Sequence, residues 1–256
     1  MKSPLKNDLC FSTKALPEIK KIIPKNSIVE TYAFYDGDLE LNLSHSERLV
    51  ISHTNKHEVY NFWRCLMEAP GAVRYLSENI YNSFPPEMLE FVQGRFQEFT
   101  DDAYNKAGIF FVLNRCSENG KVSYGKIDKT LLNPIHLSYL EGIDFSNFHL
   151  IYDKELDFID SIHPNEKTDY VILNMGNFHL NLFEDGKNIG IEETIFNHRH
   201  TIESMKRLNK KWLLIYKYHP TIIKKYSQNM SCILLNQYGF VTNKENEAKE
   251  ILLGIW

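Results

Sequence analysis

The second half of the chain alternates short apolar runs with amphipathic segments. Apolar runs bounded by turn residues predict strands at 148–152, 170–173, 211–216, 231–236 and 248–256. The segments between them predict helices at 154–162, 193–208 and 220–227. Short apolar strands that alternate with helices are typical of a mostly parallel sheet with helices on both faces.

The first half begins with two strand candidates, 27–34 ("SIVETYAF") and 47–52 ("ERLVIS"). A long region without strand patterns follows, with helices predicted at 56–69, 85–99 and 101–116. We therefore predict an α/β fold with a doubly wound, mostly parallel sheet. Its core comprises 1–55 and 145–256, and 56–144 forms a helical lobe beside it. In such a fold, ligands bind at the carboxyl ends of the strands.

Composition narrows the range of partners. The chain has 256 residues, of which 43% are hydrophobic, and a formal net charge of −4. This charge argues against a surface that is basic all over, although a local basic face remains compatible with it. Two short basic runs, "KRLNKK" (206–211) and "KKYS" (224–227), are most simply explained as solvated surface.

The four cysteines are scattered without paired spacing, which favours buried thiols in a reducing compartment over disulfides or a metal site. They are Cys10, Cys65, Cys116 and Cys232. The N-terminal sequence has no apolar core of the length that a secretory signal needs, and no apolar run reaches the length of a membrane span. We expect a cytoplasmic protein with no membrane and no metal partner; a viral source would place it in the host cytoplasm or the virion.

Four segments carry a resemblance to a known family, and they occur in that family's order. They are 17–34, 50–66, "FFVLNRCSENG" (110–120), which is close to F-L-Y-L-N-R-x-x-x-N-G, and "KWLLIYKYHPTIIKKYS" (211–227), which is similar to W-L-L-S-Y-N-x-x-P-x-I-x-x-x-Y. Over nearly its whole length the chain resembles the Dam-like adenine-specific DNA methyltransferases, which use S-adenosylmethionine. The resemblance implies a Rossmann-like methyltransferase fold, in which 56–144 corresponds to the DNA-recognition region.

The sequence departs from the family where the cofactor would bind. The family's G-G-K is Ser12-Thr13-Lys14 here, and its E-P-F-A-G-G-G is 30–36 ("ETYAFYD"). Glycines in that loop let the cofactor approach the backbone, whereas Phe34 and Tyr35 would fill the space. The resemblance leaves five vestigial cofactor positions: Lys14, Glu30, Ala33, His53 and Asp153.

Two of these positions have a plainer alternative. His53 aligns with the acidic residue that holds the cofactor ribose, but it is also explained as an ordinary histidine at a strand end. Asp153 falls near the adenine-contacting acidic position, and it is equally suited to cap a following helix.

The family's catalytic tetrad, Asp or Asn followed by two prolines and an aromatic residue, is altered in the same way. Asn174 is chemically acceptable, but Met175 and Gly176 replace the stiffening prolines and Asn177 replaces the ring that stacks on a flipped base. Phe178 would supply a ring only if the loop shifted by one residue. We expect 174–177 to form a turn after the strand.

The DNA-contacting region is also reduced. The hairpin that follows L-N-R-x-x-x-N-G in the family is shortened here. Asn114, Arg115, Lys121 and Lys126 are the candidate nucleic-acid contacts, with Lys129 as a further phosphate contact. Alternatively, Asn114 and Arg115 hold local structure.

Three hypotheses follow from these patterns. The first is a catalytically degenerate homologue with no cofactor, which acts through a protein partner, in an assembly or on DNA. The second is an active S-adenosylmethionine-dependent adenine methyltransferase with a divergent site, in which Asn174 and Phe178 are catalytic. The third is a DNA-binding pseudoenzyme. The conformation of 34–37 separates them, because an aromatic-filled cleft would oppose the second.

Overall fold

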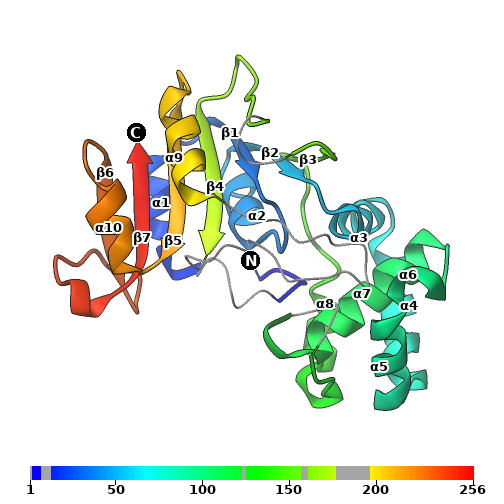
Figure 1. Ribbon diagram of the computed structural model, residues 1–256. Helices are drawn as coiled ribbons and strands as arrows, with labels where there is room; N and C mark the ends of the chain where they lie inside the picture. Colours follow the sequence, from blue (N-terminus) through cyan, green and yellow to red (C-terminus); the bar gives the residue numbers. More distant parts are fainter. Residues whose placement is uncertain (1, 7–12, 121, 123–124, 157–160, 177–196) are drawn as a thin grey trace.

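The fold is built on one seven-stranded sheet with the strand order β3-β2-β1-β4-β5-β7-β6 (Figure 1). The computed structural model describes residues 2–6, 13–120, 122, 125–156, 161–176 and 197–256. The strands are β1 (Ile28–Tyr32), β2 (Leu49–Thr54), β3 (Phe148–Tyr152), β4 (Tyr170–Gly176), β5 (Lys211–Lys217), β6 (Ser231–Asn236) and β7 (Ala248–Ile255).

Strands β1 to β5 pair in parallel, and β7 runs antiparallel between β5 and β6. This order, with the reversed strand inserted next to the edge, is the arrangement of the Rossmann-like methyltransferase fold. The predicted fold class is therefore confirmed. The continuous apolar run of β4 is explained by its position, because Val171, Ile172 and Leu173 are fully buried in the middle of a sheet that is covered on both faces.

Helices cover the two faces of the sheet in separate groups. The helices are α1 (Leu16–Ile22), α2 (Asp38–Ser44), α3 (His57–Glu68), α4 (Pro70–Ser83), α5 (Pro86–Gly94), α6 (Phe96–Phe99), α7 (Ala103–Cys116), α8 (Pro134–Ser138), α9 (His198–Arg207) and α10 (Pro220–Tyr226). Helices α1, α2 and α3 share one hydrophobic cluster with β1, β4 and β5. Helices α9 and α10 belong to a second cluster on the other side of the same strands (Figure 1).

The helices α3 to α8 lie between β2 and β3 in the order of the chain. Helix α7 is at their centre, since every residue from Ala107 to Cys116 is buried. Gly108 allows a close approach to α4, because a Cβ there would lie 3.2 Å from Cβ of Leu76. The predicted helix 85–99 is divided at Arg95, which has a non-helical backbone between α5 and α6.

Two predictions of local structure are wrong. The helix predicted at 154–162 is not formed in its described part, because Lys154 and Glu155 form a turn and 161–162 have no regular structure. The turn predicted at 174–177 is also wrong over 174–176, because β4 continues to Gly176 through an irregular register beside β5. Gly176 has a left-handed φ of 53°, which accommodates this irregularity.

None of the helices within the described ranges is long and apolar enough to cross a membrane. Two of the described cysteines, Cys65 and Cys116, are buried free thiols, and Cys232 is partly buried.

Gly239, in the hairpin between β6 and β7, packs closely against the backbone of Lys14, and its replacement should therefore lower the stability of the fold. Its φ is 82°, and a Cβ there would lie 2.0 Å from the backbone oxygen of Lys14. Gly142 has a similar φ of 74° but nothing within 4 Å of the added atom, so it serves as a matched control. We expect Gly142→Ala to lower the free energy of unfolding by about 1 kcal/mol. Gly239→Ala should lower it by about 2 to 5 kcal/mol, because overlap adds to the backbone strain.

Urea unfolding followed by tryptophan fluorescence measures both variants. Equal losses in the two would show that the hairpin does not pack on Lys14.

Candidate functional site

The loop after β1 is packed with aromatic side chains. Phe34 is fully buried and Tyr35 is 6% exposed. The Phe34 ring lies 5.4 Å from the Trp63 ring and 5.5 Å from the Phe148 ring, measured between centroids. The Trp63 indole Nε1 donates a hydrogen bond of 2.8 Å to the carbonyl oxygen of Tyr35. The loop is therefore part of the core that joins the sheet to α3.

The backbone of this loop is fixed at both ends. Ala33 has a left-handed φ of 67°, a conformation that costs a residue with a Cβ about 1 to 2 kcal/mol. Its neighbour Phe34 donates a backbone hydrogen bond of 3.0 Å to the carbonyl oxygen of His53. At the other end, Gly37 has a φ of 76° and a Cβ there would lie 2.9 Å from the Trp63 ring. Packing around Trp63 thus sets the loop's shape.

A polar network lies beside this loop on β1 and β2. The Glu30 side chain is buried, and its carboxylate accepts hydrogen bonds from the Tyr32 hydroxyl at 2.9 Å, the Thr168 hydroxyl at 2.6 Å and the backbone N–H of Asn165 at 2.8 Å. His53 Nε2 lies 3.6 Å from Glu30 Oε2, which is longer than a hydrogen bond but within range of an ion pair. The Tyr32 and His53 rings stack with centroids 4.5 Å apart.

This network has a structural consequence. Glu30 ties the segment at 165–168 to the face of β1. Burial alone would raise the pKa of Glu30, but the adjacent His53 imidazole and the hydrogen bonds from Thr168, Asn165 and Tyr32 together lower it to about 2. The pKa of Tyr32 is raised by burial and by the nearby negative charges of Glu30 and Asp153. Glu30 is therefore ionised and engaged with the protein itself.

Several buried polar atoms near the carboxyl ends of β2 and β4 have no hydrogen-bond partner among the described residues. They are both ring nitrogens of His53, Oδ1 of Asn55 and Oδ1 of Asn174. In a parallel α/β sheet this edge is where ligands bind. Buried polar atoms are ordinarily paired, so these atoms mark the part of the edge with unused hydrogen-bonding capacity.

Acidic side chains gather where the loop enters α2. Burial, together with the nearby charges of Asp38 and Glu40, raises the pKa of Asp36 well above its usual range. Burial also raises the pKa of Asp38 and raises the pKa of Glu40 to about 7. Among the described residues, no group of three or more His, Cys, Asp or Glu side chains is placed to hold a metal ion.

The Asn-Arg pair of the "LNR" motif binds the N-terminal segment. Asn114 exchanges hydrogen bonds with the backbone of Lys6, at 2.7 and 3.0 Å. Arg115 donates to the carbonyl oxygens of Ser3 and Pro4, at 2.7 and 2.5 Å. Both side chains are buried, at 0% and 9% exposure. In this structure they hold the distant residues 3–6 in place.

Residues 3–6 are a part of the site that the sequence did not indicate. Ser3 donates its backbone N–H to the Asp38 carboxylate at 2.9 Å. Gly120, the last residue of the "LNR" motif, allows the contact, because a Cβ there would lie 1.9 Å from the Lys6 oxygen. The glycine at the end of that motif was the available signal, since it permits a close backbone approach.

The structure brings most of the predicted cofactor positions together. Glu30, Ala33 and His53 surround Tyr32, and the charge of Asp153 also acts on that residue. Asp153 precedes a turn, with its carbonyl oxygen accepting from Leu156 at 3.3 Å. It caps no helix in the described residues.

Lys14 is separated from this group. Its ammonium donates a hydrogen bond of 2.9 Å to the Gln237 carbonyl oxygen in the β6–β7 hairpin. Strands β4, β5 and β7 lie between β6 and β1 in the sheet.

The remaining predicted residues are dispersed. Met175 is buried in the cluster beneath α9, and Asn174 is partly buried. Lys126 is exposed, whereas the Lys129 ammonium donates to the carbonyl oxygens of Tyr81 and Phe84 at the end of α4. Lys121, Asn177 and Phe178 lie outside the described residues.

Comparison with known proteins adds little to this geometry. No family model matches the sequence, and no curated protein matches it. Among solved structures, the chain is similar to SMU.1697c from Streptococcus mutans, a "putative methyltransferase" in complex with SAH. The identity is 12%, the TM-score is 0.37, and the match covers 96% of this chain and 100% of the other. A likeness at this level carries no argument about function.

Replacement of Glu30 tests the network on β1. A carboxyl whose folded pKa is near 2 contributes stability that is present above its unfolded pKa of about 4.5 and lost as pH falls toward 2. We expect Glu30→Gln to lower the free energy of unfolding at pH 7 by about 1 to 3 kcal/mol, because the amide cannot accept all of these bonds. The deficit should shrink between pH 4.5 and pH 3.

Urea titrations at several pH values give this comparison. Tyr32→Phe, which removes one of the donors, is the control and should lose less. A deficit that stays constant down to pH 3 would contradict the ionised network.

Glu40 should have the opposite pH dependence. Its folded pKa of about 7 lies above the unfolded value of about 4.5, so the folded state retains a proton that the unfolded state has released. The contribution of Glu40 to the free energy of unfolding therefore falls as pH rises from 4.5 through 7, because the buried carboxyl of the folded state becomes progressively more costly to keep protonated. We expect Glu40→Gln to match the unsubstituted protein at pH 5 and to exceed its unfolding free energy at pH 8 by about 1 kcal/mol or more.

The same titrations, extended to pH 8, measure this difference. The quantity compared is the unfolding free energy of Glu40→Gln minus that of the parent protein. A smaller value of this difference at pH 8 than at pH 5 would show that the carboxyl is not buried and neutral.

Proposed function

We propose that the chain is a catalytically degenerate homologue of the adenine DNA methyltransferases, which keeps the fold and acts by binding. The observation that carries the proposal is the burial of Phe34 and Tyr35 in the loop after β1. These residues stand where the family has glycines, and they are packed against Trp63 and the core around α7.

The residues of this loop do not fit S-adenosylmethionine. Bare backbone at these positions is what lets the family's cofactor approach β1. Opening the loop would expose two aromatic side chains, at a cost of about 1.5 to 3 kcal/mol each. It would also break the hydrogen bond from Trp63 to the Tyr35 carbonyl. A total of about 3 to 6 kcal/mol weakens the apparent affinity by roughly 10²- to 10⁴-fold.

The end of β4 supports the same conclusion. Met175 contributes to the hydrophobic cluster beneath α9, and Gly176 continues the strand with a left-handed backbone. Prolines would stiffen this segment in an active enzyme. Here the segment after Asn174 is part of the sheet, so its packing is explained without a flipped base.

The other family residues are engaged within the chain. Glu30 holds the 165–168 segment, and Asn114 and Arg115 hold residues 3–6. We propose that the scaffold presents its surface to a protein partner or within an assembly. In the DNA-binding version of this proposal, the contacts come from exposed cations such as Lys126.

One observation favours a second function, an active methyltransferase with a divergent site. Oδ1 of Asn174 and both ring nitrogens of His53 are buried without a hydrogen-bond partner in the described residues, at the edge where the fold binds ligands, although His53 Nε2 also lies 3.6 Å from the Glu30 carboxylate. A bound cofactor and an adenine amino group would satisfy such atoms. In this version Asn174 would accept a hydrogen bond from the adenine amino group.

Calorimetry with S-adenosylmethionine and S-adenosylhomocysteine, together with tritiated methyl transfer to unmethylated DNA, separates the two functions. We expect no binding tighter than about 1 mM, because of the cost of opening the loop, and no methyl transfer. Micromolar cofactor binding together with methyl transfer to adenine would contradict the proposal of a degenerate homologue. Loss of that transfer in a folded Asn174→Ala variant would support an active enzyme with Asn174 in its site. Near-ultraviolet circular dichroism of Asn174→Ala distinguishes lost function from lost structure.

A further inference from the structure

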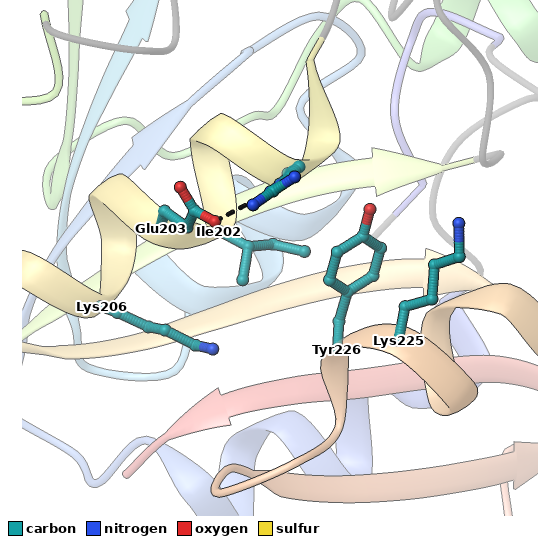
Figure 2. Close-up of a pocket in the computed structure, with 6 residues that line it drawn as sticks. Ile202, Glu203, Lys206, Lys225 and Tyr226 are labelled. Atoms are coloured by element: carbon teal, nitrogen blue, oxygen red, sulfur yellow. Dashed lines mark hydrogen bonds and ion pairs between the residues drawn. The ribbon is translucent and has the colours of Figure 1, made fainter.

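A basic groove lies between α9 and α10, on the face of the sheet opposite α1 and α2. It has a volume of about 370 Å³ and is lined by Arg199, Ile202, Glu203, Lys206, Lys225 and Tyr226 (Figure 2). Two short basic runs that are separated in the sequence by β5 and the first residues of α10 meet here, since Lys206 comes from the first run and Lys225 from the second. The fold thus joins them into one surface.

Helical periodicity explains the walls of the groove. Helix α9 buries Ile202 and Met205 against the sheet. Arg199, Glu203 and Lys206 are four and three residues apart, so they share one side of the helix. Helix α10 buries Ile222 and places Lys225 on the facing wall. The Tyr226 ring lies between the helices (Figure 2), partly buried against the second hydrophobic cluster and partly lining the groove.

The charge of this surface differs from that of the whole chain. Helices α9 and α10 carry five Lys or Arg residues, Arg199, Lys206, Arg207, Lys224 and Lys225, against the single acidic residue Glu203. The chain as a whole has 29 Lys and Arg against 33 Asp and Glu. Glu203 pairs with Arg199 at 3.1 Å. In the described part of the chain, neither Lys206 nor Lys225 has an ion-pair partner, so two exposed cations face the groove from opposite walls.

We infer that this groove binds a single strand of nucleic acid. Proteins that bind single strands combine a cationic groove, which follows the phosphates, with aromatic rings on which bases stack. Lys206 and Lys225 supply the cations here, and Tyr226 supplies the ring. The volume is at the lower end of small-ligand sites, which suits one nucleotide unit of a longer strand. A duplex would not enter a space of this size.

The aromatic ring is what favours a nucleic acid over an acidic peptide, because cations alone would attract either. The groove uses none of the residues around Tyr32 and Phe34. The inference therefore goes beyond the proposed function, and it holds whether or not the fold has retained methyl transfer.

Fluorescence anisotropy with a labelled thymidine 12-mer, measured from 50 to 300 mM salt, tests the inference on the full chain. The test variant is Lys206→Ala with Lys225→Ala. The control is Lys25→Ala with Lys154→Ala, which removes the same number of charges from exposed residues outside the groove. We expect the test variant to weaken binding by about tenfold or more and to reduce the salt slope by about 1 to 1.5. The control should change neither.

A second pair of variants tests the ring. Tyr226→Phe should retain affinity because it keeps the stacking surface, whereas Tyr226→Leu should lose about fivefold or more. Thermal unfolding of each variant confirms that the fold persists.

Each other outcome overturns the inference. Absence of binding at 50 mM salt, or equal loss in the test and control variants, would remove the groove as the site. A duplex of the same length that binds as tightly would exclude a single-strand groove. Polyglutamate that displaces the oligonucleotide at equal charge would show a general anion surface. Equal affinity of Tyr226→Leu and Tyr226→Phe would exclude stacking.

Discussion

The packing of Phe34 and Tyr35 around Trp63 is the constraint on which the arrangement of this protein depends. The hydrogen bond from the Trp63 indole to the Tyr35 carbonyl fixes the chain where it leaves β1. That position sets the start of α2 and draws α3 onto the same core. The loop after β1 is a junction between the sheet and the helices. Such a junction gives rigidity at the expense of space for a ligand.

Residues that are conspicuous as family motifs serve the chain's own backbone in this structure. Glu30 accepts hydrogen bonds from residues more than 130 positions away in the sequence. Asn114 and Arg115 form hydrogen bonds with the backbone of a segment more than 100 positions away. These are buried, charge-assisted or paired hydrogen bonds, and the loss of one partner leaves the other unsatisfied. Selection for stability alone would preserve such residues. Their presence in a motif is therefore weak evidence for catalysis.

The sheet could be read from the sequence, because the parallel strands β3, β4 and β5 and the antiparallel strands β6 and β7 are all short, largely apolar runs. Helix α4 was missed, since Pro70 and Gly71 at its start resemble a turn, and α2 was missed because its apolar positions alternate like those of a strand. The extension of β4 depends on a local irregularity that permits Gly176 to remain in the sheet. The helix predicted after β3 is replaced in its described part by a turn at Lys154 and Glu155, closed by the backbone hydrogen bond from Leu156 to Asp153.

The candidate site was only partly accessible to sequence reasoning. The aromatic residues Phe34 and Tyr35 after β1 were visible in the sequence, which predicted the crowding that they cause. The clamp on residues 3–6 was not, because it depends on pairing between distant segments. The groove between α9 and α10 was not visible either, since helical phase and the position of β5 decide that two separate basic runs share one surface.

The central position of β1 has a consequence for how the chain folds during synthesis. Its neighbours are β2, which follows soon after it, and β4, which begins at Tyr170. The edge of β1 that pairs with β4 therefore leaves the ribosome more than a hundred residues before β4 is made. Until then, Phe34 and Tyr35 can already pack on Trp63, which is close in the sequence. The aromatic cluster after β1 would thus shield the unfinished sheet from aggregation while the remaining strands are made.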